Sequence, residues 1–165
     1  MDTIQILNIF RNDQVIQQIF NGVYPIDKLP KIPFKPAALI INLDTSKQPG
    51  SHWVCLYFDI KAGCEYFDSY GRTPSKKLIN YMRKYATKIK YSKKCVQQLL
   101  TATCGQYCVY YLTWRCRGVY MKDILKSLNK EYADEFVTGF INGLFKVNTE
   151  ITDERFLQEQ WNNFT

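Results

Sequence analysis

The hydrophobic residues of this chain follow two different spacings, which predict strands and helices. Residues 37–43 form a nearly continuous apolar run, as expected for a strand covered on both faces of a sheet. Residues 52–58 and 64–68 predict two further strands, and the loop between them ends in Gly63, which indicates a hairpin. The predicted strands, two of them short edge strands, are residues 37–43, 52–58, 64–68, 88–91 and 95–97.

Apolar residues three and four positions apart predict several helices. A capping pair, asparagine followed by aspartate, opens a short amphipathic helix over residues 12–20. Four prolines within residues 22–36 predict an ordered, extended connection. Residues 104–116 are apolar or aromatic around nearly the whole helix, which indicates a central, buried helix that stops at Gly118. The predicted helices are residues 12–20, 75–85, 104–116, 122–128, 132–145 and 153–164.

Length and composition favour one domain, residues 1–165. A chain of 165 residues can bury a sizeable core, and a content of 46% hydrophobic and 15% aromatic residues excludes a disordered protein. No apolar run is long enough to cross a bilayer, and the first five residues do not form a secretory signal. We therefore expect a soluble, intracellular protein with no membrane partner.

Cysteine usage argues against a metal site. The six cysteines include no C-x-x-C pair, and the chain has one histidine, so a structural zinc site is not expected. Without a secretory signal, disulfides are not expected either. We predict that most of these thiols are reduced and buried.

The formal charge of +7 implies attraction to polyanions such as nucleic acid. A solvated basic face is the alternative interpretation. Most of the excess falls in a basic segment, 23 residues long. Its members, the candidate nucleic-acid-binding residues, are Arg72, Lys76, Lys77, Arg83, Lys84, Lys88, Lys90, Lys93 and Lys94.

Cys104 is the first candidate for chemistry, because it stands at the start of the predicted central helix. With Thr103 as the N-cap, Cys104 occupies the first helical position. A thiol there experiences the positive end of the helix dipole, which lowers its pKa and favours the nucleophilic thiolate. The alternative is a small buried hydrophobe, which is the fate of most free cysteines.

His52, the one histidine, is the natural partner for this thiol. If Phe58 faces Cys64 in the hairpin, facing residue numbers sum to 122, and Asp68 becomes the diagonal neighbour of His52 on the same face. A register shift of one residue would separate them. A carboxylate behind an imidazole beside a thiol is the arrangement for nucleophilic thiol catalysis, whereas an ordinary polar strand end is the alternative.

Two glutamines just before the cysteine are candidate oxyanion donors. Gln97 and Gln98 both carry amide N–H groups close to Cys104 in sequence, and such donors stabilise the charge that develops on a carbonyl oxygen. The residues alone do not decide between the two glutamines.

Three sequence blocks resemble a known family. Residues 50–54 (GSHWV), 66–71 (YFDSYG) and 96–108, which include VQ and TCGQYC, are similar to the signature blocks of the adenovirus-type maturation proteases. Residues 20–30 resemble the forms of this protease that polintons and virophages carry. The resemblance covers about residues 12–118. It implies an α+β fold with a central mixed sheet flanked by helices, shared with ubiquitin-like and papain-like cysteine proteases.

The resemblance also implies a function. It assigns His52, Asp68 and Cys104 to the catalytic triad of a cysteine endopeptidase that processes viral capsid proteins during virion maturation. Gln97 becomes the oxyanion donor, with Gln98 as the alternate. Asp68 departs from the glutamate of the adenoviral enzyme, and its shorter side chain requires a closer approach of the strands or a bridging water. In relatives an aromatic such as Trp53 packs beside the imidazole.

We further expect Gly105 to lie with Trp53 in the substrate groove. By resemblance, the protease acts as a monomer in the host cytoplasm, virus factory or nucleus, is packaged in the virion, and needs no metal or cofactor, although DNA is a candidate activator. Two other functions stay open. One is removal of ubiquitin-like modifiers from host proteins, and the other is nucleic-acid binding with a vestigial protease site.

Overall fold

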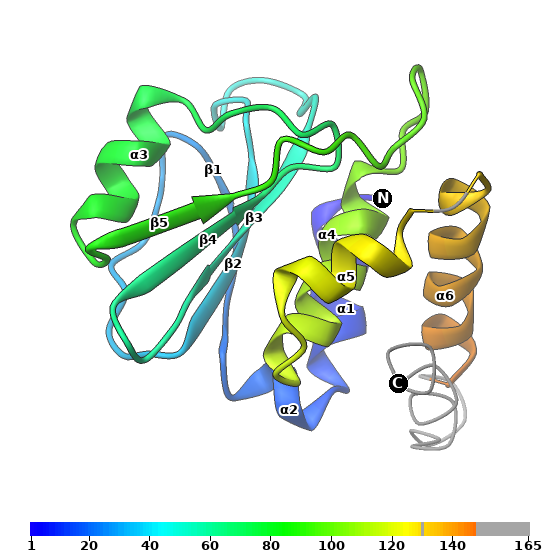
Figure 1. Cartoon of the computed structure of the whole chain (residues 1–165), viewed down its shortest axis with the longest axis horizontal. Helices are drawn as coiled ribbons and strands as arrows, with labels where there is room; N and C mark the ends of the chain where they lie inside the picture. Colours follow the sequence, from blue (N-terminus) through cyan, green and yellow to red (C-terminus); the bar gives the residue numbers. More distant parts are fainter. Residues whose placement is uncertain (130, 148–165) are drawn as a thin grey trace.

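A five-stranded mixed sheet forms the centre of the computed structural model, which describes residues 1–129 and 131–147 (Figure 1). The strand order is β1-β2-β3-β4-β5; the outer pairs β1·β2 and β4·β5 are parallel and the inner pairs are antiparallel. The α+β fold with a mixed sheet is therefore confirmed. The predicted helix at 153–164 lies outside the described residues. The strands are β1 (Phe20–Pro25), β2 (Ala37–Asn42), β3 (Trp53–Phe58), β4 (Gly63–Phe67) and β5 (Lys88–Tyr91).

The hairpin of β3 and β4 has the predicted register. Phe58 pairs with Cys64 and Cys55 pairs with Phe67, so the numbers of facing residues sum to 122. His52 comes just before β3 and Asp68 just after β4. Since the two strands are antiparallel, these two residues meet at the same end of the hairpin.

The amino-terminal part differs from the prediction. The predicted helix over 12–20 is only the short α2 (Gln14–Gln17), preceded by an unpredicted helix α1 (Thr3–Arg11). The predicted capping pair is nevertheless functional, because the Asp13 carboxylate accepts from the first N–H groups of α2. The strand β1 begins at Phe20, within the segment that was predicted to be helical, because pairing with β2 outweighs the helical spacing of the apolar residues. The register of this pairing shifts between Phe20 and Gly22, and Gly22 has a φ of +122°.

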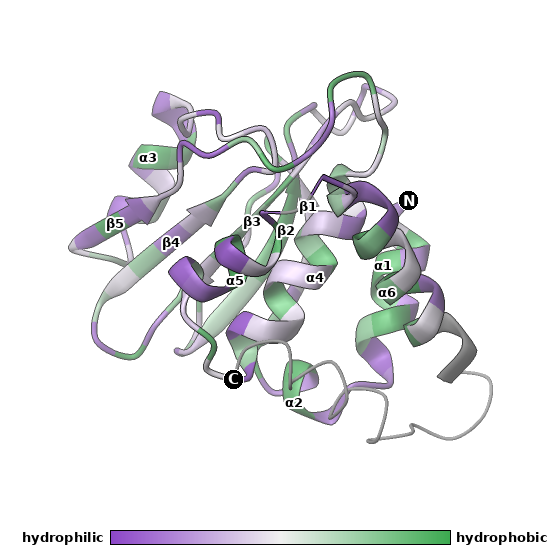
Figure 2. Ribbon diagram, turned by 45° about the vertical axis from the view of Figure 1, so that its right-hand side comes forward, coloured by the Kyte–Doolittle hydropathy of each residue, from purple (hydrophilic) through white to green (hydrophobic). Residues whose placement is uncertain are grey.

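Helices cover both faces of the sheet, as the alternation along β2 requires. Ala38 and Ile40 point into a core shared with α1, α4 and α6, whereas Leu39 and Ile41 point into a second core with α3. Figure 2 shows that the central strands β2 and β3 are mostly hydrophobic, while β5 and α5 carry more hydrophilic residues. The remaining helices are α3 (Lys76–Arg83), α4 (Cys104–Cys116), α5 (Met121–Ser127) and α6 (Ala133–Val147).

A buried ion pair fixes α4 against the sheet. The guanidinium Nε of Arg115 lies 2.6 Å from the carboxylate of Glu65 on β4, and the Tyr111 hydroxyl donates to the same carboxylate at 2.8 Å. The Arg115 guanidinium also covers the Tyr57 ring at 4.2 Å. These contacts fix the carboxyl-terminal half of α4 against the sheet. Cys104, at the other end of the helix, then lies near the end of the sheet where β3 begins and β4 ends.

None of the helices that the structure describes combines the length and apolar character that a bilayer crossing requires.

The turn after β4 admits only glycine at position 71. Gly71 has a φ of +67°, and a Cβ there would lie 2.5 Å from the carbonyl oxygen of Lys93. We expect Gly71→Ala to lower the free energy of unfolding by about 2–4 kcal/mol, measured by urea unfolding, because backbone strain and overlap with backbone atoms add. Gly118→Ala is the control: its φ is +92°, but its Cβ would meet no atom within 4 Å, so about 1 kcal/mol is expected. Equal losses for the two variants would contradict the close approach.

Candidate active site

His52 and Asp68 form a buried pair. The imidazole Nε2 lies 2.8 Å from Asp68 Oδ1, and the two residues are 6% and 1% exposed. The same carboxylate oxygen accepts from the backbone N–H of Tyr70 at 2.8 Å. The predicted meeting of the two side chains is therefore confirmed, and the shorter aspartate needs no bridging water. Because Asp68 occupies Nε2, the other ring nitrogen, Nδ1, is left for the thiol.

Cys104 opens α4 beside this imidazole. Burial alone would raise the pKa of the Cys104 thiol, but hydrogen bonds with His52 and with the backbone N–H groups of Trp53 and Gly105 outweigh it and lower the pKa. Burial alone would lower the pKa of His52, but hydrogen bonds with Asp68 and Cys104 outweigh it and raise the pKa to about 9. The two shifts have opposite directions, so both favour a thiolate next to an imidazolium over a neutral thiol next to a neutral imidazole.

The other cysteines differ from Cys104. Burial raises the pKa of Cys64 and Cys108, and it raises the pKa of Cys116 to about 12. Cys95 is exposed, and the six cysteines are all free. Residues 1–129 and 131–147 contain no group of three or more His, Cys, Asp or Glu side chains that could hold a metal ion.

Thr103 is the N-cap residue of α4 and Cys104 is the first helical residue, as predicted. The Thr103 side chain makes no capping hydrogen bond to the helix. Its hydroxyl instead donates to the carboxylate of Asp134 on α6 at 2.7 Å, because this buried carboxylate competes for it. The first N–H groups of α4, including that of Cys104, belong to a helix turn that has no intrahelical acceptors for them.

Gln97 is buried and its amide is bound within the loop before α4. Its Oε1 accepts from Ser69 Oγ at 2.6 Å, and its Nε2 donates to the Thr101 carbonyl at 2.8 Å and to the Tyr70 hydroxyl at 3.1 Å. Since these bonds engage both N–H groups, donation to an oxyanion requires that one of them opens when substrate binds. The role of Gln97 as oxyanion donor stays a prediction.

Residues 95–97 do not form the predicted edge strand. The N–H groups of the last two of them both donate to the carbonyl of Ser69, at 2.8 and 3.1 Å, so the segment lies against the turn after β4 without the alternating partners of a ladder. Gln98, the alternate donor, has an exposed side chain that bonds the carbonyl oxygen of Glu131 at 3.4 Å.

Tyr70 is a site residue whose part the sequence only hinted at. Its ring stacks on His52 with centroids 5.1 Å apart, and its hydroxyl donates to the Thr101 carbonyl at 3.1 Å. Because facing residue numbers sum to 122, the predicted register also puts Tyr70 opposite His52, and this signal could have identified the contact. Tyr70 thus connects the imidazole, the carboxylate and the loop that carries Gln97.

Asp134 organises the same loop from the start of α6, and sequence reasoning missed it. Its buried carboxylate accepts from the backbone N–H of Gln98 at 3.0 Å and from the hydroxyls of Thr101, Thr103 and Tyr107 at 2.6 to 2.8 Å. Burial alone would raise the pKa of Asp134, but these hydrogen bonds outweigh it and lower the pKa. No sequence signal connects a residue 30 positions after Cys104 with this loop.

We expect Asp134→Asn to reduce kcat of the peptide cleavage that the sequence blocks predict by about 10- to 100-fold, because an amide can replace only part of this set of acceptors. KM should change less, since the loop positions the reacting groups. Glu135→Gln is the control, because Glu135 is the exposed neighbour of Asp134 and the substitution makes the same change in charge. It should leave kcat within about twofold of wild type. Steady-state kinetics on the two variants checks this, and equal effects would contradict a specific role for Asp134.

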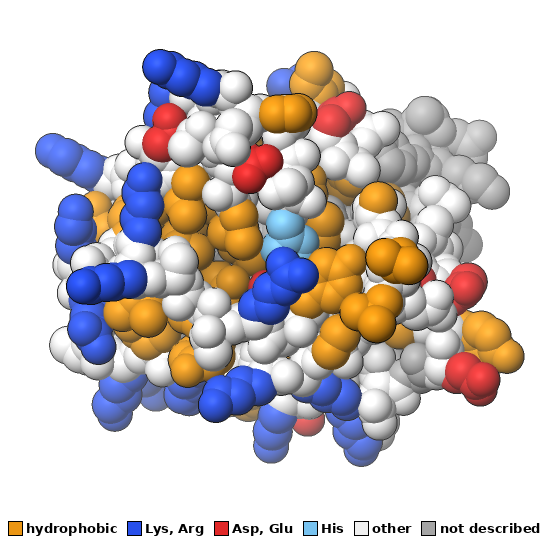
Figure 3. Space-filling model, turned by 90° about the horizontal axis from the view of Figure 1, so that it is seen from above, with side chains coloured by type: hydrophobic (Ala, Val, Ile, Leu, Met, Phe, Trp, Pro, Cys, Tyr) orange, Lys and Arg blue, Asp and Glu red, His pale blue; other side chains and the backbone are white. Residues whose placement is uncertain are grey.

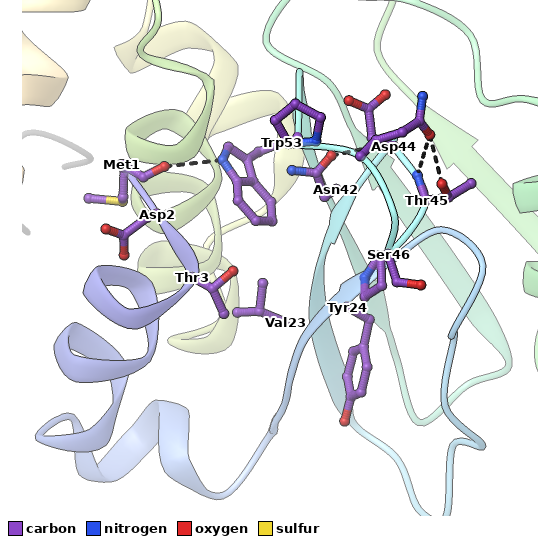
Figure 4. A pocket seen from close by; sticks show the side chains of 14 residues that line it. Met1, Asp2, Thr3, Val23, Tyr24, Asn42, Asp44, Thr45, Ser46 and Trp53 are labelled. Atoms are coloured by element: carbon purple, nitrogen blue, oxygen red, sulfur yellow. Dashed lines mark hydrogen bonds between the residues drawn. The ribbon is translucent and has the colours of Figure 1, made fainter.

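A pocket of about 420 Å³ lies beside Trp53, the residue that follows His52 (Figure 4). The Trp53 indole N–H donates to the carbonyl oxygen of Met1 at 3.2 Å at its edge, and Thr3, Val23 and Ser46 contribute to its lining.

Gly105 lies against one wall of this pocket. A Cβ at Gly105 would come within 3.0 Å of Met1 Cβ and 3.3 Å of Trp53 Cδ1. A residue with a side chain would fit there only if its neighbours shifted. The expected place of Gly105 and Trp53 in a substrate groove stays a prediction.

The nine residues of the basic segment are all exposed. They lie on the turn after β4, along α3 and β5 and in the loop that follows β5. The guanidinium of Arg72 covers the Tyr70 ring at 4.9 Å, so the segment begins next to the site. Figure 3 shows basic side chains along the left and lower edges of this face, a further one against the histidine at its centre, and hydrophobic side chains beside that histidine.

Known proteins with similar sequences are viral proteases. No known family model matches the sequence. A cysteine protease of African swine fever virus (isolate Tick/Malawi) is 27% identical over 136 residues, 75% of this chain and 49% of that protein. A relative from isolate Warthog/Namibia, named a SUMO-1 cysteine protease, is 26% identical over the same length. A protein of Acanthamoeba polyphaga mimivirus named as a thiol protease is 43% identical over 76 residues, 45% of this chain and 24% of that protein. The chain thus spans about half the length of the African swine fever virus relatives.

Solved structures show the fold. The crystal structure of the African swine fever virus protease superimposes with a TM-score of 0.59 at 20% identity, covering 84% of this chain and 65% of that one. ChlaDub1 from Chlamydia trachomatis gives a TM-score of 0.53 at 16% identity, covering 90% and 77%. The chain therefore has a papain-like cysteine protease fold, and its sequence relates it to the viral cysteine proteases of African swine fever virus and mimivirus.

Proposed function

We propose that the protein is a cysteine endopeptidase in which Cys104 is the nucleophile, His52 the acid and base, and Asp68 the group that orients the imidazole. The observation that carries this proposal is the chain of contacts from Asp68 through Nε2 of His52 to Cys104, with opposite pKa shifts for the thiol and the imidazole. Opposite shifts of two neighbouring groups are typical of catalytic pairs.

The reaction would follow from this geometry. The Cys104 thiolate attacks the scissile carbonyl carbon, and the negative charge moves to the carbonyl oxygen, where the Cys104 N–H and the Gln97 amide act as donors. The C–N bond then breaks while the His52 imidazolium gives its proton to the leaving amine, which leaves an acyl thioester. Neutral His52 next takes a proton from water, whose oxygen attacks the thioester. Loss of the thiolate releases the acid and restores the ion pair.

The proposal is tested on a peptide library made from a denatured bacterial proteome, with the cleavage products identified by mass spectrometry. Wild-type protein should produce new amino termini at a restricted set of sites, with small residues such as glycine before the cleaved bond. Pretreatment with iodoacetamide should remove them and leave the label on Cys104. Cleavage that survives complete labelling of Cys104 would exclude this thiol as the nucleophile.

We propose more specifically that the substrates of this endopeptidase are viral capsid proteins, as in the adenovirus-type maturation proteases that the sequence blocks resemble. The viral origin of the relatives supports it. Co-incubation with the capsid proteins encoded in the same genome should yield discrete fragments, with the same residue preferences as in the peptide library. Intact capsid proteins alongside active peptide cleavage would contradict capsid processing and leave the protease assignment in place.

A second candidate substrate is a ubiquitin-like modifier, because some relatives are named SUMO-1 cysteine proteases. A SUMO-1 vinyl sulfone probe distinguishes it: a covalent adduct on Cys104 supports this substrate, and a protein that cleaves peptides but ignores the probe excludes it.

The basic segment supports a further proposal, that DNA binds and stimulates the enzyme. Its nine lysine and arginine side chains are exposed, and such a cluster attracts phosphate without sequence preference. Anisotropy of a labelled duplex should show binding that weakens steeply as salt rises, and the rate of peptide cleavage should increase when DNA is present. Salt-independent binding, or an unchanged rate, would contradict the proposal.

A further inference from the structure

Two leucines form the most exposed apolar feature of the described chain. Leu99 is 79% exposed and Leu100 is fully exposed, more than any other large hydrophobic side chain in the described residues. Single exposed apolar residues are common on protein surfaces, but here two neighbours project together. We refer to these two residues as the leucine tip.

The backbone conformation that projects the leucine tip outward is energetically unfavourable. Leu100 has a φ of +68°, a left-handed conformation that L-residues other than glycine rarely adopt. Such a conformation persists only where the surrounding structure enforces it, and it is concentrated at functional sites. The conformation and the exposure of Leu100 therefore require an explanation in the contacts around the tip.

Those contacts lie at the base of the tip. On one side the N–H of Gln98 donates to Asp134, and on the other the Thr101 hydroxyl donates to the same carboxylate. The Thr101 carbonyl also accepts from Tyr70 and from Gln97. Hydrogen bonds thus fix the chain immediately before and after the two leucines, and the leucine tip projects from this fixed base.

The base of the tip is also the scaffold of the candidate active site. Gln97 precedes the leucine tip, Cys104 follows it, and Tyr70 joins its base to His52. Leu100 stands four positions before Cys104, so at most about 14 Å of chain separates them, a distance that about four residues of an extended substrate span. The leucine tip and the candidate nucleophile thus belong to one loop. This connection favours a bound protein substrate as the partner of the tip, which exposure alone would not indicate.

We propose that the leucine tip is a docking contact for an apolar side chain of the protein substrate, a few residues from the scissile bond. The inference rests on the proposed function and adds a specificity determinant to it. Burying leucine side chains against an apolar partner removes both from water, which offsets the cost of presenting them. A substrate with serine at the contacting position lacks this apolar contact and should bind less tightly.

The experiment compares wild-type protein with Leu99→Ser/Leu100→Ser on the proteome-derived peptide library. Wild type should show an enrichment of apolar residues at one position flanking the cleavage site, and the double variant should lose that enrichment while it keeps the preference at the cleaved bond. Ile60→Ser is the matched control, because Ile60 is 72% exposed on the β3–β4 turn, at the opposite end of β3 from His52. This control should keep the enrichment.

Two decapeptides then quantify the contact: the best-cleaved library sequence, and the same sequence with serine at the enriched position. Wild type should prefer the apolar peptide by about tenfold in kcat/KM, and the double variant by less than about twofold. A preference that persists in the double variant, or wild-type cleavage with no apolar preference, overturns the inference and leaves the protease proposal intact. Failure of wild type to cleave any peptide contradicts the proposed function itself.

Other occupants of the leucine tip would produce different results. If it joins two copies of the chain, light scattering shows a dimer that the double variant loses, with no change in peptide preference. If it enters a lipid surface, wild type but not the double variant sediments with phosphatidylcholine–phosphatidylserine vesicles, again with no change in preference. Either of these two results overturns the substrate assignment.

Discussion

Replacing Cys104 with alanine should abolish peptide cleavage and leave the fold intact. The proposed reaction begins at this sulfur, and no other described thiol lies beside the imidazole, so kcat should fall by about 10⁴-fold or more. The structural cost should be small, because alanine fits a position that is buried at the start of α4 and forms no disulfide. Initial rates on the best library peptide measure the loss, and far-UV circular dichroism and thermal unfolding measure the fold.

Cys95→Ala serves as the matched control for the Cys104 variant. Cys95 is the exposed free thiol closest in sequence before the nucleophile, so its replacement tests whether loss of any thiol reduces the rate. We expect a rate within about twofold of wild type. A Cys104→Ala protein that still cleaves with a substantial rate would falsify the assignment of the nucleophile.

The second large effect is the pH dependence of the thiolate–imidazolium pair. The pKa of Cys104 is lowered and that of His52 is raised to about 9, so the ion pair exists between these two values. As pH falls through the lowered thiol pKa, the thiolate is protonated and kcat/KM should decrease. As pH rises through about 9, the imidazolium loses the proton that the leaving amine needs, and kcat/KM should decrease again. The profile should therefore be bell-shaped, with its maximum between the lowered pKa of Cys104 and about pH 9.

Asp68→Asn tests the cause of the alkaline limb. The hydrogen bond with the carboxylate and its charge raise the pKa of His52, so removing the charge should move the alkaline limb to lower pH. It should also reduce kcat by about 10²-fold or more, because the imidazole loses its orienting partner. An alkaline limb that stays in place would contradict the direct His52–Asp68 interaction as the source of the raised pKa.

Thiol alkylation reports the same pair without a substrate. In a Cys95→Ser background, which removes the exposed competing thiol, iodoacetamide should label Cys104 at pH 6 to 7 far faster than it labels free cysteine. The buried Cys64, Cys108 and Cys116 should not react, because burial raises the pKa of each. A Cys104 that reacts only above about pH 8.5, like an ordinary thiol, would contradict the lowered pKa.

Most of the regular elements near the site could be predicted because their signals are local. The hairpin loop sets the pairing of β3 with β4, and counting residues from Phe58 and Cys64 was enough to bring His52 and Asp68 together. The apolar circumference of residues 104–116 likewise identified the central helix, and Thr103 as N-cap identified its first residue. The amino-terminal prediction failed because β1 owes its structure to pairing with β2, and pairing between distant segments has no local signature.

The environment of the loop before α4 could not be predicted for the same reason. Thr103 is the N-cap residue, as expected, but its hydroxyl donates to Asp134 on α6 and makes no bond to α4. Gln97 was expected to donate to an oxyanion, but in this structure its amide is bound to Ser69 and Thr101. Both outcomes depend on polar partners that are distant in sequence, and only packing decides which partner a side chain meets.

Local patterns along the chain were sufficient for the periodicities of the central strands and of α4, for the register of one hairpin with its His52–Asp68 pair, and for the choice of thiol. The folded structure was needed to show that this thiol meets the imidazole, that Asp134 and Tyr70 hold the loop before α4, and that the leucine tip faces water. The physical reason is range: hydrophobic period and turn chemistry act over a few residues, whereas pKa shifts, buried hydrogen bonds and surface exposure arise from neighbours that only folding brings together.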